Sequence, residues 1–456
     1  MNRYRDPVFM HDAQGMRRAP HAPRVFAVAV AVATAAFLAG CGSSGPGGSA
    51  HQPVNVVIFE PLAGADSVFV GQDIAGVHAA VDVINAAGPP LGRKISVQFA
   101  NSYDDPADAV PATRRMLATT SNVIGIMGPT TNPGEAIAPI LNSAKIPFFP
   151  DSGDVAFDTS HYPYLWRPTP SDSVLGYVLA AYAHKLGYTR VATLFGNNIG
   201  SSDEVTNAVG GTQRLGGTVV LKQSLALDQS SYNSEVSAML AAHPQVILTE
   251  TDPQTTDTYF TEMEQLNHGK LIPVIDDGYL SVITAARNSA IKAIGAATMA
   301  RYWRGVTQVG LSGGPGWSVY DEALKSLKGI SGLSNPGQYY NDSYSQTFYD
   351  AVTDLALAMV ASKSSDPSVL NNWISRLTAP HAGAVVVHTY AAGRAALLAG
   401  KSIQYVGVSG PQHYNKYHNN LLPYVAVKIL PSGQATDFAT ITQADIASVD
   451  PTFARS

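Results

Sequence analysis

Short apolar runs alternate with longer amphipathic stretches along residues 54–276, and this alternation is the strongest indication of the fold class in the sequence. The short runs are rich in β-branched and aromatic residues, which is typical of buried strands, and the stretches between them repeat apolar residues at helical spacing. The predicted strands are Val54–Glu60, Lys94–Ala100, Asn122–Gly128, Ile146–Pro150, Arg190–Gly196, Gly217–Leu221, Gln245–Glu250 and Leu271–Asp276. This alternation predicts an α/β fold with parallel sheets, right-handed crossovers and helices on both faces.

The proline-rich segment 158–170 contains no predicted strand and interrupts the alternation. It therefore predicts two α/β lobes rather than one very wide sheet, and a chain of 456 residues is long enough for two or more domains. Beyond Val282 the pattern becomes more helical, and it ends in extended segments near Tyr405–Ser409 and Tyr424–Leu430.

The N-terminal region has the pattern of a secretory signal. An uncharged run, Val25–Leu38, follows several arginines and ends in small residues, and it is too short to cross a bilayer stably. The sequence Leu38-Ala39-Gly40-Cys41 resembles the bacterial lipobox, in which the cysteine is acylated and begins the mature chain. We therefore expect a lipoprotein exported and anchored on the extracytoplasmic side of the cell membrane. The alternative is an ordinary signal peptide in which Cys41 is incidental.

Residues 42–53 are rich in Gly, Ser and Pro, which predicts a flexible tether. Removing residues 1–40 takes away five of the 29 basic and two of the 34 acidic side chains, which leaves a net charge of −8. A mildly acidic exported domain is poorly suited to bind nucleic acid or an anionic membrane surface by charge. Because Cys41 is the only cysteine, we expect no disulfide.

The sequence gives little support for the motifs of common enzymes. Gly310–Gly314 fits the G-x-S-x-G pattern of a hydrolase, but no helix begins directly after Ser312, as a nucleophile elbow requires. The twelve histidines show no metal-ligand spacing, and no glycine-rich nucleotide motif follows a predicted strand. We therefore expect no enzyme activity, no metal and no cofactor. A weak alternative is an extracytoplasmic hydrolase that uses Ser312.

The stretch GPTTNPGEAIAP (Gly128–Pro139) lies at the carboxyl end of a predicted strand and opens a predicted helix. The first N–H groups of a helix are unpaired and carry partial positive charge, so they suit an anion such as a carboxylate. The side chains of Thr130, Thr131 and Asn132 add hydrogen-bonding groups, and ligands of open α/β sheets bind at such strand ends. The alternative is a helix cap and nothing more.

At this point the chain resembles the type I periplasmic solute-binding proteins of ABC importers, in the branched-chain amino acid (Leu/Ile/Val) group. The resemblance spans residues 54–430 and rests on segments in the expected order. These segments are Ile84–Ile95, Asn101–Val110, Gly128–Phe149, Trp166–Asp172 and Leu397–Pro411. It implies two Rossmann-like lobes joined by a hinge that the chain crosses three times.

The resemblance also implies a division of the chain into domains. The expected order is a signal peptide with lipobox at 1–40, a lipidated tether at 41–53 and a C-terminal tail at 431–456. The first lobe is expected to hold 54–167 plus about 281–379. The second lobe is expected to hold about 168–278 plus about 380–430.

Family members hold an amino acid ligand by its two charged ends. The resemblance implies carboxylate contacts from Thr130, Thr131 and Asn132, with Asn132 where relatives usually carry a serine. Asp277 occupies the place of the acid that holds the ammonium group. The other implied ligand contacts are Val70, Ser152, Gly153, Asp154, Ile199 and Asp252.

Several of these positions depart from the family pattern. Val70 stands where relatives often carry an aromatic residue, Ile199 where a tyrosine is common, and Asp154 replaces a threonine. Asp252 adds an acid where a tyrosine is expected. Because a carboxylate close to an anion site repels a ligand carboxylate, a cationic, amide-bearing or larger polar solute fits better than leucine, isoleucine or valine. The alternative is that these acids face solvent or pair with lysines.

The expected function is capture of a small polar solute and its delivery to the permease subunits of an ABC importer. The expected partners are the small-molecule ligand, those permease subunits and the membrane through the N-terminal lipid, with no nucleic acid, and the protein is expected to be a monomer. The alternative is a sensing module of the same fold that signals to a membrane partner.

Overall fold

The computed structural model describes residues 52–64, 67, 70–169, 171–308, 313–412, 414–420 and 424–449. The predictions for the signal peptide, Cys41, most of the tether and Ser312 lie outside these residues. Among the described residues, none of the helices combines the length and the apolar character needed to span a bilayer.

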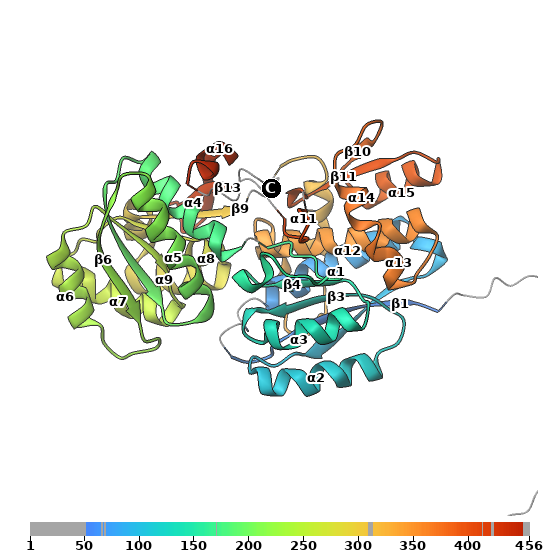
Figure 1. Ribbon diagram of the computed structural model, residues 1–456, viewed down its shortest axis with the longest axis horizontal. Coiled ribbons are helices and arrows are strands. Elements are labelled where there is room, and N and C mark those ends of the chain that lie inside the picture. The colour runs from blue at the N-terminus through green and yellow to red at the C-terminus, as the bar shows by residue number, and fades with distance from the viewer. Residues whose placement is uncertain are drawn as a thin grey trace, which may run out of the picture. The chain divides into compact units, whose positions relative to one another are not determined.

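The first sheet has four parallel strands in the order β2-β1-β3-β4 (Figure 1). The strands are β1 (Val54–Glu60), β2 (Ile95–Asn101), β3 (Val123–Thr130) and β4 (Phe148–Asp151). Helices α1 (Val70–Ala87), α2 (Pro106–Thr119), α3 (Thr131–Ser143) and α12 (Ser343–Ser362) pack on it.

Strand β1 shows why this sheet is covered on both faces. Val56 and Ile58 share a buried core with α1 and α12, whereas Val57 and Phe59 share another with α2 and α3. Successive side chains of a strand point to opposite faces, so a continuous apolar run needs helices on each side. Figure 1 shows α2 and α3 together on one face and α1 and α12 on the other.

The second sheet has seven strands in the order β14-β13-β9-β8-β7-β5-β6. The strands are β5 (Arg190–Gly196), β6 (Thr218–Leu225), β7 (Val246–Glu250), β8 (Val274–Asp276), β9 (Trp303–Gln308), β13 (Tyr424–Ile429) and β14 (Ala435–Ile441). Strands β5 to β9 are parallel, and β13 runs antiparallel to both of its neighbours.

Two helical layers also cover the second sheet. One face packs against α4 (Asp172–Lys185), α5 (Ile199–Arg214) and α16 (Gln443–Ala447). The other face packs against α6 (Asn233–Ala242), α7 (Pro253–Leu266), α8 (Tyr279–Val282), α9 (Thr284–Ile294) and α10 (Ala296–Tyr302). This is the doubly covered parallel architecture that the alternation of strands and helices predicts.

A small three-stranded sheet packs beside the first lobe. It consists of β10 (Val385–Val387), β11 (Ile403–Gly407) and β12 (Gly410–Pro411). Helices α14 (Ile374–Thr378) and α15 (Tyr390–Leu398) pack against it, and α11 (Trp317–Ser326) and α13 (Pro367–Asn371) pack on α1 and α12. The 3₁₀ turns of the described residues include η2 (Pro90–Gly92), η3 (Val155–Phe157) and η4 (Pro336–Tyr339). Side chains of these helices share the core of α1 and α12.

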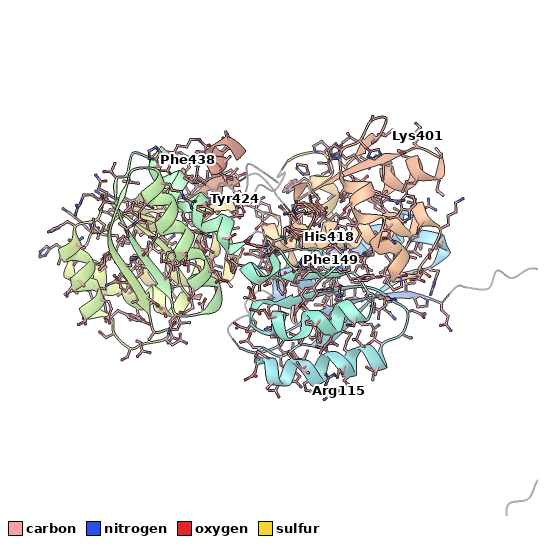
Figure 2. The ribbon with its side chains drawn as sticks, in the orientation of Figure 1. Arg115, Phe149, Lys401, His418, Tyr424 and Phe438 are labelled. Atoms are coloured by element: carbon pink, nitrogen blue, oxygen red, sulfur yellow. The ribbon has the colours of Figure 1, made fainter. Side chains whose placement is uncertain are left out.

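The chain passes between the two lobes three times, after β4, after β9 and after β12, so the molecule has the predicted three-crossing fold. The first and third crossings are bonded to each other. Arg167 N–H donates to the His418 carbonyl (2.9 Å), and Asn420 N–H donates to the Arg167 carbonyl (3.0 Å). His418, labelled in Figure 2, stacks on Trp166 with ring centroids 3.7 Å apart. These contacts join the first and third crossings of the hinge.

All eight predicted strands form, with ends shifted by a few residues at most. The lobe boundaries differ from the expectation in three segments. Residues 281–308 pack in the second lobe, because β9 pairs with β8. Residues 385–411 pack with the first lobe, because β11 pairs with β10 and buries Ile403 and Tyr405 in that core. The expected tail instead forms β14 and α16, which bury Ile441 and Ile446.

Candidate functional site

The strand ends of both sheets surround a cavity of about 410 Å³. Thr130 ends β3, Asp151 ends β4 and Glu250 ends β7, while Asp277 directly follows β8. These four residues line the cavity, and α4 and α5 of the second lobe contribute Asp172, Gly200 and Glu204. In α/β folds the carboxyl ends of parallel strands are where ligands bind, and the volume is in the range of small-molecule sites.

The start of α3 supplies hydrogen-bonding groups from the first lobe. Thr130 stands at the N-cap position, but its side chain caps no helix N–H group, and its buried Oγ1 has no partner. Thr131 and Asn132 line the cavity with it, and Asn132 Nδ2 donates to Asp104 Oδ1 (3.1 Å). The helix start therefore offers unpaired donors to the cavity.

Asp151 lies beside this helix start, because it pairs with Thr130 in the register of β3 and β4. Its side chain is 6% exposed and lines the cavity. A carboxylate that lines the cavity on the strand next to this helix start weakens the attraction of that part of the cavity for an anionic ligand group.

Four acidic side chains form a group that we call the acidic quartet: Asp172, Glu204, Glu250 and Asp277. Burial raises the pKa of Glu204 well above its usual range, and Asp277, Glu250 and Asp172 raise it further by like-charge repulsion. Burial, followed by the repulsion of Glu250, also raises the pKa of Asp172 and of Asp277. A nearby cation stabilises the ionised form of buried carboxyl groups whose pKa is raised in this way.

The quartet has few internal partners. Ser201 Oγ donates to Glu250, and Tyr279 N–H donates to Asp277 Oδ1 (3.1 Å). Glu204 is 1% exposed, and its Oε1 has no hydrogen-bond partner. Burial of a polar oxygen without a hydrogen-bond partner destabilises the folded protein, and a ligand group that donates a hydrogen bond to this oxygen offsets that cost.

A second acidic pair lies in the loops after β6 and β7. Asp228 and Asp252 both line the cavity, and burial and then Asp252 raise the pKa of Asp228. Asp252 Oδ1 accepts from Thr255 N–H (3.0 Å) and so caps α7. This capping role positions Asp252 whether or not a ligand is bound.

The cavity contains no basic side chain among the described residues that line it. The nearest guanidinium is that of Arg167, which is 1% exposed and forms an ion pair with Asp158. Its NH1 also donates to the carbonyls of Gly153 (3.3 Å) and Asp154 (2.8 Å). Arg167 therefore holds the hinge segment together and is not among the groups that line the cavity.

The structure brings together six of the ten residues that the sequence suggests as ligand contacts. Thr130, Thr131, Asn132, Gly153, Asp252 and Asp277 line the cavity. Of Ile199, only its place in the chain is described: it opens α5 between Asn198 and Gly200, which both line the cavity.

Three of the ten do not line the cavity. Val70 is part of the apolar core of the first lobe. Ser152 Oγ accepts from Asp154 N–H (3.3 Å), and Asp154 Oδ1 accepts from Ala156 N–H (2.8 Å) and caps η3. The acid beside the helix start is thus Asp151, three residues before the one that the sequence suggests.

Most of the acidic groups that line the cavity were not predicted from the sequence. Asp151, Asp172, Glu204 and Glu250 all line the cavity and were not among the candidates. Asp151 and Glu250 each end a strand of a parallel sheet, and this position in the sequence could have indicated a ligand contact. Glu204 lies inside helix α5, where nothing in the local sequence separates it from a surface glutamate.

Comparison with known proteins identifies the class. A family model described as periplasmic binding protein matches residues 53–377, which is more than half of the chain. The chain belongs to this family of extracytoplasmic binding proteins. No curated protein matches the sequence.

Solved structures share the fold at low identity. A leucine binding protein from Thermotoga maritima has a TM-score of 0.67 and 18% identity, over 86% of this chain and 99% of that one. A solute-binding protein of an ABC transporter from R. palustris, in complex with benzoate, has a TM-score of 0.65 and 14% identity, over 86% and 96%. A fatty acid ABC transporter substrate-binding protein from Thermomonospora curvata has a TM-score of 0.65 and 12% identity, over 89% and 96%. These structures support the two-lobed fold.

Proposed function

We propose that this protein is an extracytoplasmic solute-binding lipoprotein that delivers a small polar ligand to an ABC importer. The ligand class is an amino acid or a related amide or cationic compound. The observation that carries the proposal is the cavity of about 410 Å³, to which the strand ends of both sheets contribute polar side chains. The similar structures named for leucine, benzoate and fatty acid transport support the importer role and leave the ligand of this chain open.

The hinge supports capture by closure. Two of the three crossings are bonded to each other through Arg167, His418 and Asn420, while each lobe has its own core. Two rigid bodies joined by a short hinge close around a ligand with little internal change. Closure excludes water, so the hydrogen bonds and charges of the cavity discriminate strongly between solutes.

The start of the folded body supports a tether from an N-terminal lipid. Arg93 Nε donates to the Gln52 carbonyl (2.7 Å), and its NH1 donates to Ser365 Oγ (2.6 Å). The folded body is therefore fastened directly after the Gly/Ser-rich segment that follows Cys41. A segment with this Gly/Ser-rich composition is predicted to act as a tether that lets an anchored body reach a permease in the same membrane.

A thermal-shift screen tests the binding function. Amino acids, amides and amines are added to purified protein, and one of them should raise the melting temperature. A ligand at 100 times its dissociation constant adds about 2.7 kcal/mol to the free energy of unfolding. If no small polar solute raises the melting temperature, the proposed ligand class is wrong.

The lipid anchor has a separate test. Cys41→Ala should release the protein from the membrane fraction or stall its processing, because the acylated residue is gone. Fractionation of cells that express the variant, with wild-type cells alongside, measures this. A variant that is matured normally and stays firmly membrane-bound contradicts the anchor.

A further inference from the structure

We propose that the ligand is an organic cation with at least two amino groups and no carboxylate. This inference rests on the proposed function, since it names the solute class of the same cavity. Seven acidic residues line the cavity: Asp151, Asp172, Glu204, Asp228, Glu250, Asp252 and Asp277. No Lys, Arg or His lies among the described lining residues to balance them.

Two side chains that line the cavity each have a buried polar atom without a hydrogen-bond partner. Glu204 Oε1 comes from the second lobe and Thr130 Oγ1 from the first; the two side chains are 1% and 0% exposed. Buried polar atoms are almost always satisfied in folded proteins. An acceptor such as the Glu204 carboxylate is satisfied by an N–H group, and an ammonium supplies both the hydrogen bond and the charge.

A ligand carboxylate has no cationic partner here. The helix start at Thr130 could receive one, but the Asp151 carboxylate stands beside it on β4. The Arg167 guanidinium does not line the cavity: it is paired with Asp158 and its NH1 donates to two carbonyls, while its Nε is buried without a hydrogen-bond partner. Repulsion between like charges therefore disfavours an amino acid at the point where an amino acid binder needs an anion site.

The acids are spread over both lobes, which favours more than one positive group. Asp151 belongs to β4 of the first sheet, whereas the quartet belongs to the second lobe. A single ammonium satisfies one buried carboxylate oxygen, whereas Glu204 Oε1 and Asp252 Oδ2 in this cavity are both buried without a hydrogen-bond partner. A ligand with amines at two ends supplies an N–H group to each of these oxygens.

The chemistry of the cavity favours an organic cation over a metal ion. No group of three or more His, Cys, Asp or Glu side chains among the described residues is placed to hold a metal. Tyr279 and Tyr344 line the cavity and offer aromatic faces. Aromatic rings attract alkylammonium groups and also bury the methylene chain between two amines.

Isothermal titration calorimetry with matched pairs of solutes tests the inference. Each pair differs by one carboxylate: 1,5-diaminopentane against lysine, 1,4-diaminobutane against ornithine, and agmatine against arginine. Leucine and calcium chloride complete the set. The inference predicts that at least one amine without a carboxylate binds about tenfold or more tightly than its amino acid partner.

The outcomes separate this inference from the proposed function. If an amino acid or an amide binds and the amines do not, the inference fails and the binding function stands. If calcium alone binds, the inference fails in favour of a metal site. If none of these solutes nor any in the wider thermal-shift screen binds, the proposed function fails as well.

A charge-removing variant locates the site. Glu204→Gln keeps the size of the side chain and should weaken amine binding about tenfold or more, because one buried acceptor loses its charge. Glu322→Gln is the matched control, since Glu322 is exposed on α11 and does not line the cavity. Asp172→Asn provides a second test if Glu204→Gln folds poorly. Unchanged affinity in both cavity variants overturns the inference.

Discussion

Two cavities of this protein are lined by opposite kinds of titratable side chain, acidic in one and basic in the other. The cavity at the strand ends has a volume of about 410 Å³ and is lined by seven acidic residues. A larger cavity of about 990 Å³ lies around α14, α15 and β11 and includes no acidic residue among its described lining residues. Its charged and titratable side chains are Lys363, Arg376, His381, Arg394 and Lys401.

The difference between them lies in burial. In the larger cavity Lys363, Arg376 and Lys401 are exposed. Because water solvates their charges, an ion pair with a ligand adds little to the free energy of binding. In the smaller cavity Glu204 and Thr130 are buried and unpartnered. Size alone favours the larger cavity, whereas the buried unpartnered groups, Thr130 at a strand end of the first lobe and Glu204 on α5 of the second, favour the smaller one.

The largest expected effect comes from adding one methyl group at Gly153. A Cβ atom there would lie 1.8 Å from Asp172 Oδ1, so Gly153→Ala forces Asp172 out of its place in the cavity. We expect no measurable binding of 1,5-diaminopentane by calorimetry. Gly210→Ala in α5 is the control, because its Cβ meets nothing within 4 Å, and it should bind as wild type. Full affinity in Gly153→Ala would mean that Asp172 does not contact the ligand.

A smaller loss is expected from Asp277→Asn. The amide keeps an acceptor for Tyr279 N–H but removes a charge from the quartet. Affinity for 1,5-diaminopentane should fall about tenfold, as for loss of one charge-assisted hydrogen bond. The same variant should bind an amide such as acetamide no worse than wild type does. An equal loss for both solutes would show that the variant damages the fold and not the charge.

The pH dependence of stability gives a third prediction. Burial raises the pKa of Asp276 from 3.8 to about 6, and that of Asp342 from 3.8 to about 7. Their folded-state pKa values are raised, so the stability they contribute is present below pH 4 and is lost as the pH rises through about 6 and about 7. Unliganded protein should therefore melt at a lower temperature at pH 8 than at pH 5.5.

Asp342→Asn should flatten the upper part of this profile. The amide still caps α12, where Asp342 Oδ1 accepts from Ser345 N–H (3.0 Å), but it no longer titrates. The titratable neighbours Arg287 and Asp73 remain in place. A melting temperature that rises steadily from pH 5.5 to pH 8 would contradict the direction of these shifts.

The smallest effect is expected in the larger cavity. Lys401→Glu reverses a charge there, yet it should leave the affinity for 1,5-diaminopentane unchanged, since Lys401 does not line the smaller cavity. Calorimetry with this variant and wild type makes the comparison. A marked loss of affinity in Lys401→Glu would show that the larger cavity takes part in ligand binding.

The strands were predictable because their apolar runs are continuous and bounded by turns, as Val54–Glu60 and Arg190–Gly196 show. Later segments were harder. The sequence Trp303–Gln308 alternates too little to reveal β9, and only its pairing with β8 assigns it to the second lobe. Sheet membership of this kind depends on contacts far apart in the chain, which local patterns do not report.

The site was predictable where it lies on local motifs. The helix start at Thr130–Asn132 and the loop acid Asp277 lie at strand ends, and all of these residues line the cavity; their contact with a ligand stays a prediction. Glu204 and Asp172 lie on helices, and their role comes from burial against acids of other elements. Asp154 was predicted from its position as a ligand contact, but its side chain caps η3.

The most direct test of the account is whether proton release accompanies binding. The raised pKa values of Asp172, Glu204 and Asp277 favour protonated carboxyl groups in the free cavity, and a bound diammonium lowers these pKa values, so that protons pass from the carboxyl groups to the buffer. Calorimetric titrations with 1,5-diaminopentane at pH 7, in phosphate and in Tris, measure the protons transferred to the buffer. The account predicts binding with net proton release that shrinks in Glu204→Gln. Binding without proton release, or with proton uptake, would contradict it.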